Sequence, residues 1–154
     1  MTPSNFNPAS DQALVSETEV SATHVEVIET VISSLQENGS AMVSKTDDRY
    51  LWKFNYGSVE VFVQLTGETD EDELTVWSPV LKLPISKEAE LTKRLLELNW
   101  TSTFESRFAI VDGQVVVASS RTVAELSPGE VSRNITVVAT IADDYDEALQ
   151  AEFG

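Results

Sequence analysis

Apolar side chains recur at helical spacing in three segments of the chain, and each repeat predicts an amphipathic helix. The first helix is predicted within residues 21–35, before the stop signal Asn38-Gly39, on apolar positions three or four residues apart: Val25, Ile28, Ile32 and Leu35. The second runs from Ser86, a residue type favoured at the N-cap, to about Leu98, with further leucines on the same face. Each stripe covers one side of its helix, which is typical of helices that pack on a core.

The third helix is predicted from its start signal as well as from its spacing. Ser127 and Glu130 have capping-box spacing, and Pro128 falls at the first helical position. Behind this start, apolar side chains keep helical spacing: Val131, Ile135, Val138, Ala142, Tyr145 and Leu149. Residues 135–138 are rich in β-branched side chains that could also form a strand, but the start signal and the longer stripe favour a helix.

Two runs of alternating apolar and polar residues, 50–56 and 59–65, flank Gly57-Ser58 and predict a tight β-hairpin. In this register one face collects the aromatic and aliphatic side chains and is predicted to be core: Tyr50, Trp52, Phe54, Tyr56, Val59, Val61, Val63 and Leu65. The opposite face is mostly polar, with Leu51 and Phe62 as its two apolar exceptions.

Three further strands are predicted downstream of this hairpin. Residues 74–83 form the first, and Pro79, which cannot donate a ladder hydrogen bond, places this strand at a sheet edge or marks a bulge. Residues 104–111 and 114–122 form the other two, because they flank Asp112-Gly113, a strong short hairpin signal.

The chain is therefore predicted to be an α+β protein, with helices packed on an antiparallel sheet of about five strands in the order α-β-β-β-α-β-β-α. Residues 1–20 show no sustained period and are predicted to form a flexible tail. The remaining residues, 21–154, are expected to form a single domain, because a chain of about 150 residues can bury a sufficient core on its own.

A candidate partner or dimer surface follows from the strand register. If the third strand turns Leu74 and Val76 towards the core, Trp77 points outwards beside Phe62 and Leu51. Leu51, Phe62 and Trp77 would then form one apolar patch, a feature that folded monomers seldom leave uncovered. A helix or the N-terminal tail of the same chain is the alternative cover for this patch.

Charge limits the classes of partner. The formal net charge is -16, from 26 acidic and 10 basic side chains. Phosphate backbones are bound largely through lysine and arginine, so nucleic acid and anionic membrane surfaces are unfavourable partners. The chain has no cysteine, no basic and apolar start, and no apolar run near the ~20 residues of a membrane span, so we expect a cytoplasmic protein.

The sequence contains no pattern typical of a catalytic, cofactor-binding or metal-binding site. Its six glycines stand too far apart for a phosphate-binding loop, and its single histidine, His24, cannot complete a multi-histidine metal site. The acidic runs 70–73 and 143–147 offer oxygen ligands for calcium but lack the glycine and closing glutamate of an EF-hand loop. We therefore predict no catalytic residue, no cofactor and no bound metal.

Several of these features together resemble the YbjN family of bacterial sensory transduction regulators. They are the order of elements, the segment Leu95-Leu96-Glu97-Leu98-Asn99, the phenylalanine-rich strand that turns at Asp112-Gly113, and the closing helix with Asp143-Asp144-Tyr145-Asp146. The resemblance covers about residues 21–153. It implies a fold similar to that of type III secretion chaperones, and it implies no catalytic residue.

The function predicted from these features is a non-enzymatic protein-interaction or regulatory module that acts as a homodimer on a protein partner. The alternative is a chaperone-like binder of unfolded or partner protein segments, which would suppress aggregation of its partner. A distant alternative is a carboxylate-dependent hydrolase. This last function requires a concave pocket with two facing carboxylates about 5–9.5 Å apart, one of them with a raised pKa.

Overall fold

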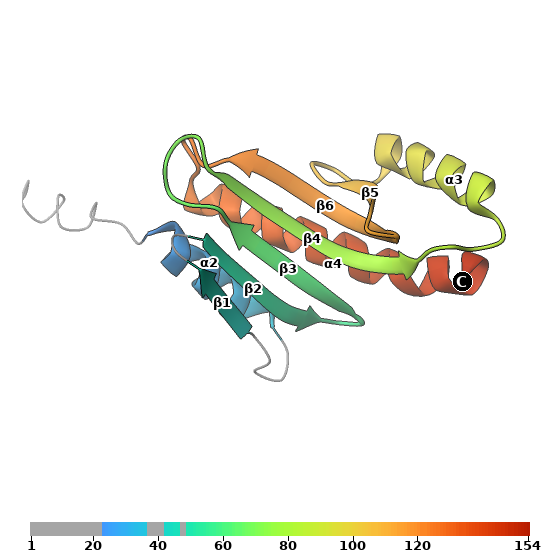
Figure 1. Ribbon diagram of the computed structural model, residues 1–154, viewed down its shortest axis with the longest axis horizontal. Helices are drawn as coiled ribbons and strands as arrows, with labels where there is room; N and C mark the ends of the chain where they lie inside the picture. Colours follow the sequence, from blue (N-terminus) through green and yellow to red (C-terminus); the bar gives the residue numbers. More distant parts are fainter. Residues whose placement is uncertain (1–22, 37–41, 47–48) are drawn as a thin grey trace, which may run out of the picture.

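The computed structural model describes residues 23–36, 42–46 and 49–154, and Figure 1 shows their arrangement. The predicted tail and the stop signal Asn38-Gly39 lie outside these residues. Three helices and six strands follow one another along the described chain: α2 (His24–Leu35), β1 (Met42–Thr46), β2 (Arg49–Tyr56), β3 (Val59–Leu65), β4 (Glu73–Lys82), α3 (Glu88–Thr101), β5 (Arg107–Val111), β6 (Gln114–Thr122) and α4 (Pro128–Phe153).

The six strands form one antiparallel sheet in the order β1-β2-β3-β4-β6-β5, so β1 and β5 are its edge strands. The predicted α+β class is confirmed, and the structure adds a sixth strand, β1, to the five that were expected. In β1 the apolar residues Met42 and Val43 are adjacent, so no period of two marks it as a strand. Backbone pairing with β2 makes it one, from Met42 opposite Lys53 to Thr46 opposite Arg49.

The β2–β3 hairpin has the register that Gly57-Ser58 predicts. Tyr56 pairs with Val59 at the turn, and Tyr50 pairs with Leu65 at the far end. Gly57 has a φ of 54°, in the left-handed region that glycine adopts without steric cost. Burial alternates along β3 as predicted, with every odd-numbered residue from Val59 to Leu65 buried.

The bulge predicted at Pro79 is present, whereas the alternative of an edge strand is wrong. β4 lies inside the sheet between β3 and β6, and its pairing with β6 shifts between Pro79 and Leu81. Pairing with β3 covers only Leu74 to Trp77. Beyond Trp77, β4 pairs with β6 alone, and the Ser78 hydroxyl still donates to the carbonyl oxygen of Glu60 on β3 at 2.8 Å.

One face of the sheet is covered by α4, with α2 packed beside it (Figure 1). Ser127 and Glu130 form the predicted capping box and Pro128 begins the helix, so the strand alternative for residues 135–138 is wrong. The predicted stripe residues that α2 and α4 bury are Ile28, Ile32, Val131, Ile135, Val138, Ala142 and Leu149.

α3 packs beside β5 and against the end of α4. It begins at Glu88, after Lys87, and no side chain caps it, so the N-cap predicted at Ser86 is wrong. Arg94 donates to both carboxylate oxygens of Glu152 on α4, at 3.0 and 2.8 Å. This bidentate ion pair joins α3 to α4.

The side chain of Asn99 is hydrogen-bonded to the backbone of β5 at the free edge of the sheet. Its side-chain Nδ2 donates to the carbonyl oxygen of Phe108 at 3.2 Å, and its Oδ1 accepts from the Phe108 N–H at 2.7 Å. Asn99 thus takes the positions that a further strand would occupy. The strand predicted from residue 104 begins only at Arg107, because Phe104 has a left-handed φ of 53°, which interrupts the extended backbone.

Candidate protein-interaction surfaces

The sheet has a second face, which points away from α4 and carries no helix in the described part of the chain (Figure 1). Leu51 of β2, Phe62 of β3 and Trp77 of β4 alternate with buried core residues and therefore belong to this face. We call it the helix-free face. The structure places all three residues of the predicted patch on it.

Phe62 and Trp77 are direct cross-strand partners, and their rings stack with centroids 5.3 Å apart and planes at 11°. Both side chains are half-buried. Leu51 pairs with Gln64, next to the pair between Lys53 and Phe62, so it is a diagonal neighbour of Phe62. The structure thus joins two of the predicted residues in one aromatic pair and places Leu51 on β2, separated from Trp77 by the intervening strand β3.

The apolar strip continues from Trp77 onto β6. Trp77 pairs with Ala118, and Pro79 pairs with Val116. Ala118 and Val116 are only 7% and 1% exposed although their pairing places them on the helix-free face. Neither residue was predicted to belong to the patch. The signal was the unbroken apolar run 115–118, which is typical of a strand with apolar side chains on both faces.

Charges beside the aromatic pair are few and balanced. Nζ of Lys53, the cross-strand partner of Phe62, lies 3.2 Å from Oε2 of Glu60. Gln64 and Thr75, which pair with each other beside the aromatic rings, are uncharged. The helix-free face is therefore close to neutral around Phe62, although the whole chain carries a formal net charge of -16.

A second apolar surface lies on α3 and on the residues that follow it. Leu96, Trp100 and Phe104 are 65%, 90% and 75% exposed, and we call these three residues the α3 surface. Leu96 and Trp100 stand one helical turn apart. A pocket of about 530 Å³ lies beside them, lined by Lys93, Leu96, Glu97, Trp100 and Thr101.

The α3 surface was not predicted from the sequence. The leucines of the inward stripe account for the helix, and Leu91 and Leu95 are indeed buried. The available signal was a second apolar pair at a spacing of four, Leu96 and Trp100, on the other side of the same helix. Sequence periodicity alone does not tell which of two such stripes a protein leaves uncovered.

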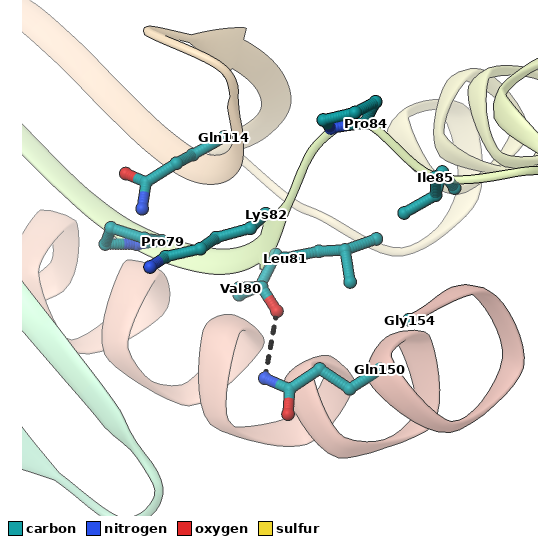
Figure 2. Close-up of a pocket in the computed structure, with 9 residues that line it drawn as sticks. All are labelled: Pro79, Val80, Leu81, Lys82, Pro84, Ile85, Gln114, Gln150 and Gly154. Atoms are coloured by element: carbon teal, nitrogen blue, oxygen red, sulfur yellow. Dashed lines mark hydrogen bonds between the residues drawn. The ribbon is translucent and has the colours of Figure 1, made fainter.

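A groove of about 510 Å³ lies at the bulge, between the ends of β4 and α4 (Figure 2). It is lined by Pro79, Val80, Leu81, Lys82, Pro84, Ile85, Gln114, Gln150 and Gly154. At the bulge, the carbonyl oxygen of Val80 accepts a hydrogen bond from Nε2 of Gln150 on α4 at 3.1 Å. Pro79 belongs to this groove and to the helix-free face, so the groove adjoins that face.

A polar pocket of about 300 Å³ between β6 and the start of α4 contains two carboxylates, those of Glu105 and Glu130. An arginine holds each of them: Arg133 Nε donates to Oε1 of Glu105 at 2.6 Å, and Arg121 is ion-paired with Glu130. The hydrogen bond from Arg133 lowers the pKa of Glu105. The general acid of a hydrolase needs a raised pKa, so Glu105 is unsuited to that role.

Acidic side chains from both runs considered for calcium act as hydrogen-bond acceptors within the fold. Asp72 accepts from the backbone N–H and the hydroxyl of Thr69 at 2.9 and 2.7 Å, and these bonds lower its pKa. Asp143 and Asp146 of α4 both accept from Ser58 in the β2–β3 turn. These three carboxylates stabilise the loop before β4 and the hairpin turn.

His24 fastens the start of α2 to two loops. Its Nε2 lies 3.2 Å from the carbonyl oxygen of Leu126, and its Nδ1 lies 3.7 Å from Oε1 of Glu68. Within the described ranges, no three side chains from histidine, cysteine, aspartate or glutamate are grouped to hold a metal ion. None of the helices described is both long and apolar enough to cross a membrane.

The chain is similar to one protein family and to solved structures. The family profile described as "YbjN: Putative bacterial sensory transduction regulator" matches residues 24–151. A chain in the crystal structure of the ExsC-ExsE complex superposes with a TM-score of 0.51 at 14% identity, covering 80% of this chain and 91% of that chain. No curated protein matches. The structural likeness concerns the fold alone, and the predicted architecture of helices packed on an antiparallel sheet is confirmed.

Proposed function

Since this chain belongs to the YbjN family, we propose that it is a non-enzymatic protein-interaction module with a regulatory role, acting as a homodimer in the cytoplasm. The observation that carries the proposal is the stacked pair of Phe62 and Trp77 on the helix-free face. Leu51 completes the proposed partner site on the same face.

Burial energetics favour a partner over this aromatic pair. Full burial of a large apolar side chain contributes about 1.5–3 kcal/mol relative to exposure, and Phe62 and Trp77 keep part of their surface exposed. A partner that covered both rings would gain the remainder. The cores of protein interfaces are enriched in aromatic side chains and depleted of charge, which describes the surroundings of this pair.

The net charge of the chain restricts the chemistry of the partner. At a formal charge of -16, long-range attraction favours a protein segment that carries lysine or arginine around its apolar contacts. A nucleic acid, which binds through its phosphates, would be repelled. We therefore propose a protein segment with apolar side chains flanked by basic ones, bound on the helix-free face.

A chaperone-like binder of extended segments is the second candidate function, and the groove at the bulge favours it. The groove adjoins the helix-free face at Pro79, and most of its lining side chains are apolar (Figure 2). An extended chain lying along Trp77 could continue into this groove. Such a binder is expected to slow the aggregation of its partner, whereas a binder of folded surfaces is not.

Partner capture from native cytosol tests the proposal. A tagged wild-type chain is compared with the double variant Phe62→Ser/Trp77→Ser and with the control Val43→Ser. Val43 is an exposed apolar residue that pairs with the core residue Trp52 and so lies off the helix-free face. The proposal expects a protein that the wild type and the control retain and the double variant loses.

Circular dichroism and a denaturation curve must show that the double variant remains folded. If the folded double variant captures the same proteins as the wild type, the proposed site is overturned. Loss of folding at the temperature of capture would show instead that the protomer needs this partly buried aromatic pair for its own stability.

A further inference from the structure

The exposed apolar side chains of the molecule are concentrated around the α3 surface. Of the six large apolar side chains that the described residues leave exposed, five lie within residues 96–111: Leu96, Trp100, Phe104, Ile110 and Val111. Single exposed apolar residues are normal, but a concentration of this kind marks a contact surface. α3 and β5 pack side by side, so these residues share one end of the molecule (Figure 1).

The fold of the protomer does not use the outer side of α3. Leu91 and Leu95 already bury its inner side. Arg94 fixes the helix to α4, and Asn99 fixes it to the edge of β5. α3 is therefore a rigid support that presents Trp100 to solvent.

Phe104 combines exposure with backbone strain. Its φ of 53° lies in the left-handed region, which bulky residues seldom adopt. Strain of this kind persists where the surrounding structure enforces it, and it collects at contact and ligand sites. Here it accompanies an aromatic ring that is left in solvent just beyond the end of α3.

We propose that the α3 surface pairs with the same surface of a second copy of this chain across a two-fold axis. This inference rests on the proposed function, in which the protein is a homodimer. It assigns the second copy to α3 and leaves the helix-free face to the other partner. An isologous contact of this type requires a surface that is complementary to itself.

Charge makes the outer side of α3 self-complementary. Lys93 and Glu97 both line the pocket beside Leu96 and Trp100, so the surface carries one charge of each sign. When two α3 helices cross in antiparallel fashion near Leu96, Lys93 of each copy faces Glu97 of the other, and symmetry forms this ion pair twice.

Self-pairing through the acidic surfaces of the molecule meets stronger repulsion. The formal charge of -16 means that most surfaces bring like charges together when two copies meet. At the α3 surface the charges cancel locally. The pocket of about 530 Å³ beside Trp100 also offers space for the indole ring of the second copy.

The test uses the full chain and measures its mass by sedimentation equilibrium over a concentration series. The wild type is expected to dimerise. Leu96→Ser/Trp100→Ser is expected to raise the Kd of the dimer at least tenfold, with an unchanged denaturation midpoint in the monomer range because both side chains are exposed in the protomer. Phe62→Ser/Trp77→Ser is the matched control and is expected to leave the dimer intact.

Charge reversal tests the symmetry of the contact. Lys93→Glu and Glu97→Lys are each expected to weaken the homodimer, since like charges then face one another. An equimolar mixture of these two variants is expected to dimerise again, because only the mixed pair places opposite charges across the axis. A mixture that stays monomeric would overturn the antiparallel arrangement.

The outcomes separate this inference from the proposed function. A wild type that stays monomeric at every concentration contradicts the homodimer, while partner capture still tests the helix-free face. A dimer that survives Leu96→Ser/Trp100→Ser overturns the assignment to α3 alone. Dissociation by Phe62→Ser/Trp77→Ser would place the dimer contact on the helix-free face instead.

Discussion

The hydroxyl of Ser58, in the turn between β2 and β3, donates to Oδ1 of the buried Asp146 on α4 at 2.8 Å. Asp143, one helical turn earlier, accepts the backbone N–H of Ser58 at 2.9 Å. Two carboxylates on one side of α4 therefore hold the hairpin turn against the helix. Gly57 packs against Asp143 at this point, which leaves no room for a β-carbon.

Ser58→Ala is expected to reduce the free energy of unfolding by about 1.5–3 kcal/mol, because it removes the hydroxyl that donates to a buried carboxylate. Chemical denaturation gives the value. Ser33→Ala, at an exposed position of α2, is the control and should change stability by less than about 0.5 kcal/mol. The double variant Ser58→Ala/Asp146→Ala should lose less stability than the sum of the losses of the two single variants. A purely additive loss would contradict this coupling.

Ser127→Ala is expected to cost about 1 kcal/mol, because the Ser127 hydroxyl accepts from the Glu130 N–H and caps α4. Ser86→Ala is the matched control, since α3 begins after Lys87 without a side-chain cap. Its denaturation midpoint should match that of the wild type. Equal losses in the two variants would show that Ser127 does not act as a cap.

Trp77→Ser is expected to cost about 1–2 kcal/mol, since the side chain stays partly exposed and part of the loss is the stacking contact with Phe62. Phe54→Ser, in the core, should cost considerably more, about 3–5 kcal/mol. Denaturation of both variants under one condition compares them. A loss for Trp77→Ser as large as that for Phe54→Ser would mean that the helix-free face is covered within the chain.

Acid should destabilise the loop before β4 through Asp72. Hydrogen bonds from Thr69 lower the pKa of Asp72 from 3.8, so its contribution to stability is complete above that pH and is lost as the pH falls through the lowered value. The denaturation midpoint is measured from neutral pH to below pH 3.8. Asp72→Asn should be less stable than the wild type at neutral pH, and the difference should shrink in acid. A constant difference would contradict the role of the ionised carboxylate.

Duplex DNA or RNA should not be retained at physiological salt. The chain has 10 basic against 26 acidic side chains, which is too few for a useful phosphate-binding surface. Filter binding or electrophoretic mobility measures retention. Micromolar binding that weakens steeply with added salt would show that charge does not exclude this class of partner.

The hairpin at Gly57-Ser58 could be predicted in full because three local signals agree: the turn residues, the period of two, and the side of the strand that is apolar. Once that register is given, Phe62 must lie opposite the core, and the structure confirms this. β1 could not be predicted, because tertiary pairing and not pattern makes it a strand. The same holds for the start of α3, where Ser86 has the right residue type but the helix begins two residues later.

The candidate site was predictable only in part. Leu51, Phe62 and Trp77 share a face for reasons of register alone, so the sequence sufficed to place them there. Trp100 could not be recognised as exposed, since that depends on Arg94 and Asn99 fixing which side of α3 turns inwards. Whether a partner covers the helix-free face remains a prediction.

The side-chain amide of Asn99, bound to both backbone groups of Phe108, also opposes the addition of a further strand at the β5 edge, a step of fibrous aggregation. Growth of a cross-β fibril requires each copy to accept a strand at both edges of its sheet. At β5 the amide already occupies the place where the next strand would begin to pair. Addition of a further strand to the edge of the sheet is therefore left to β1, the other edge strand.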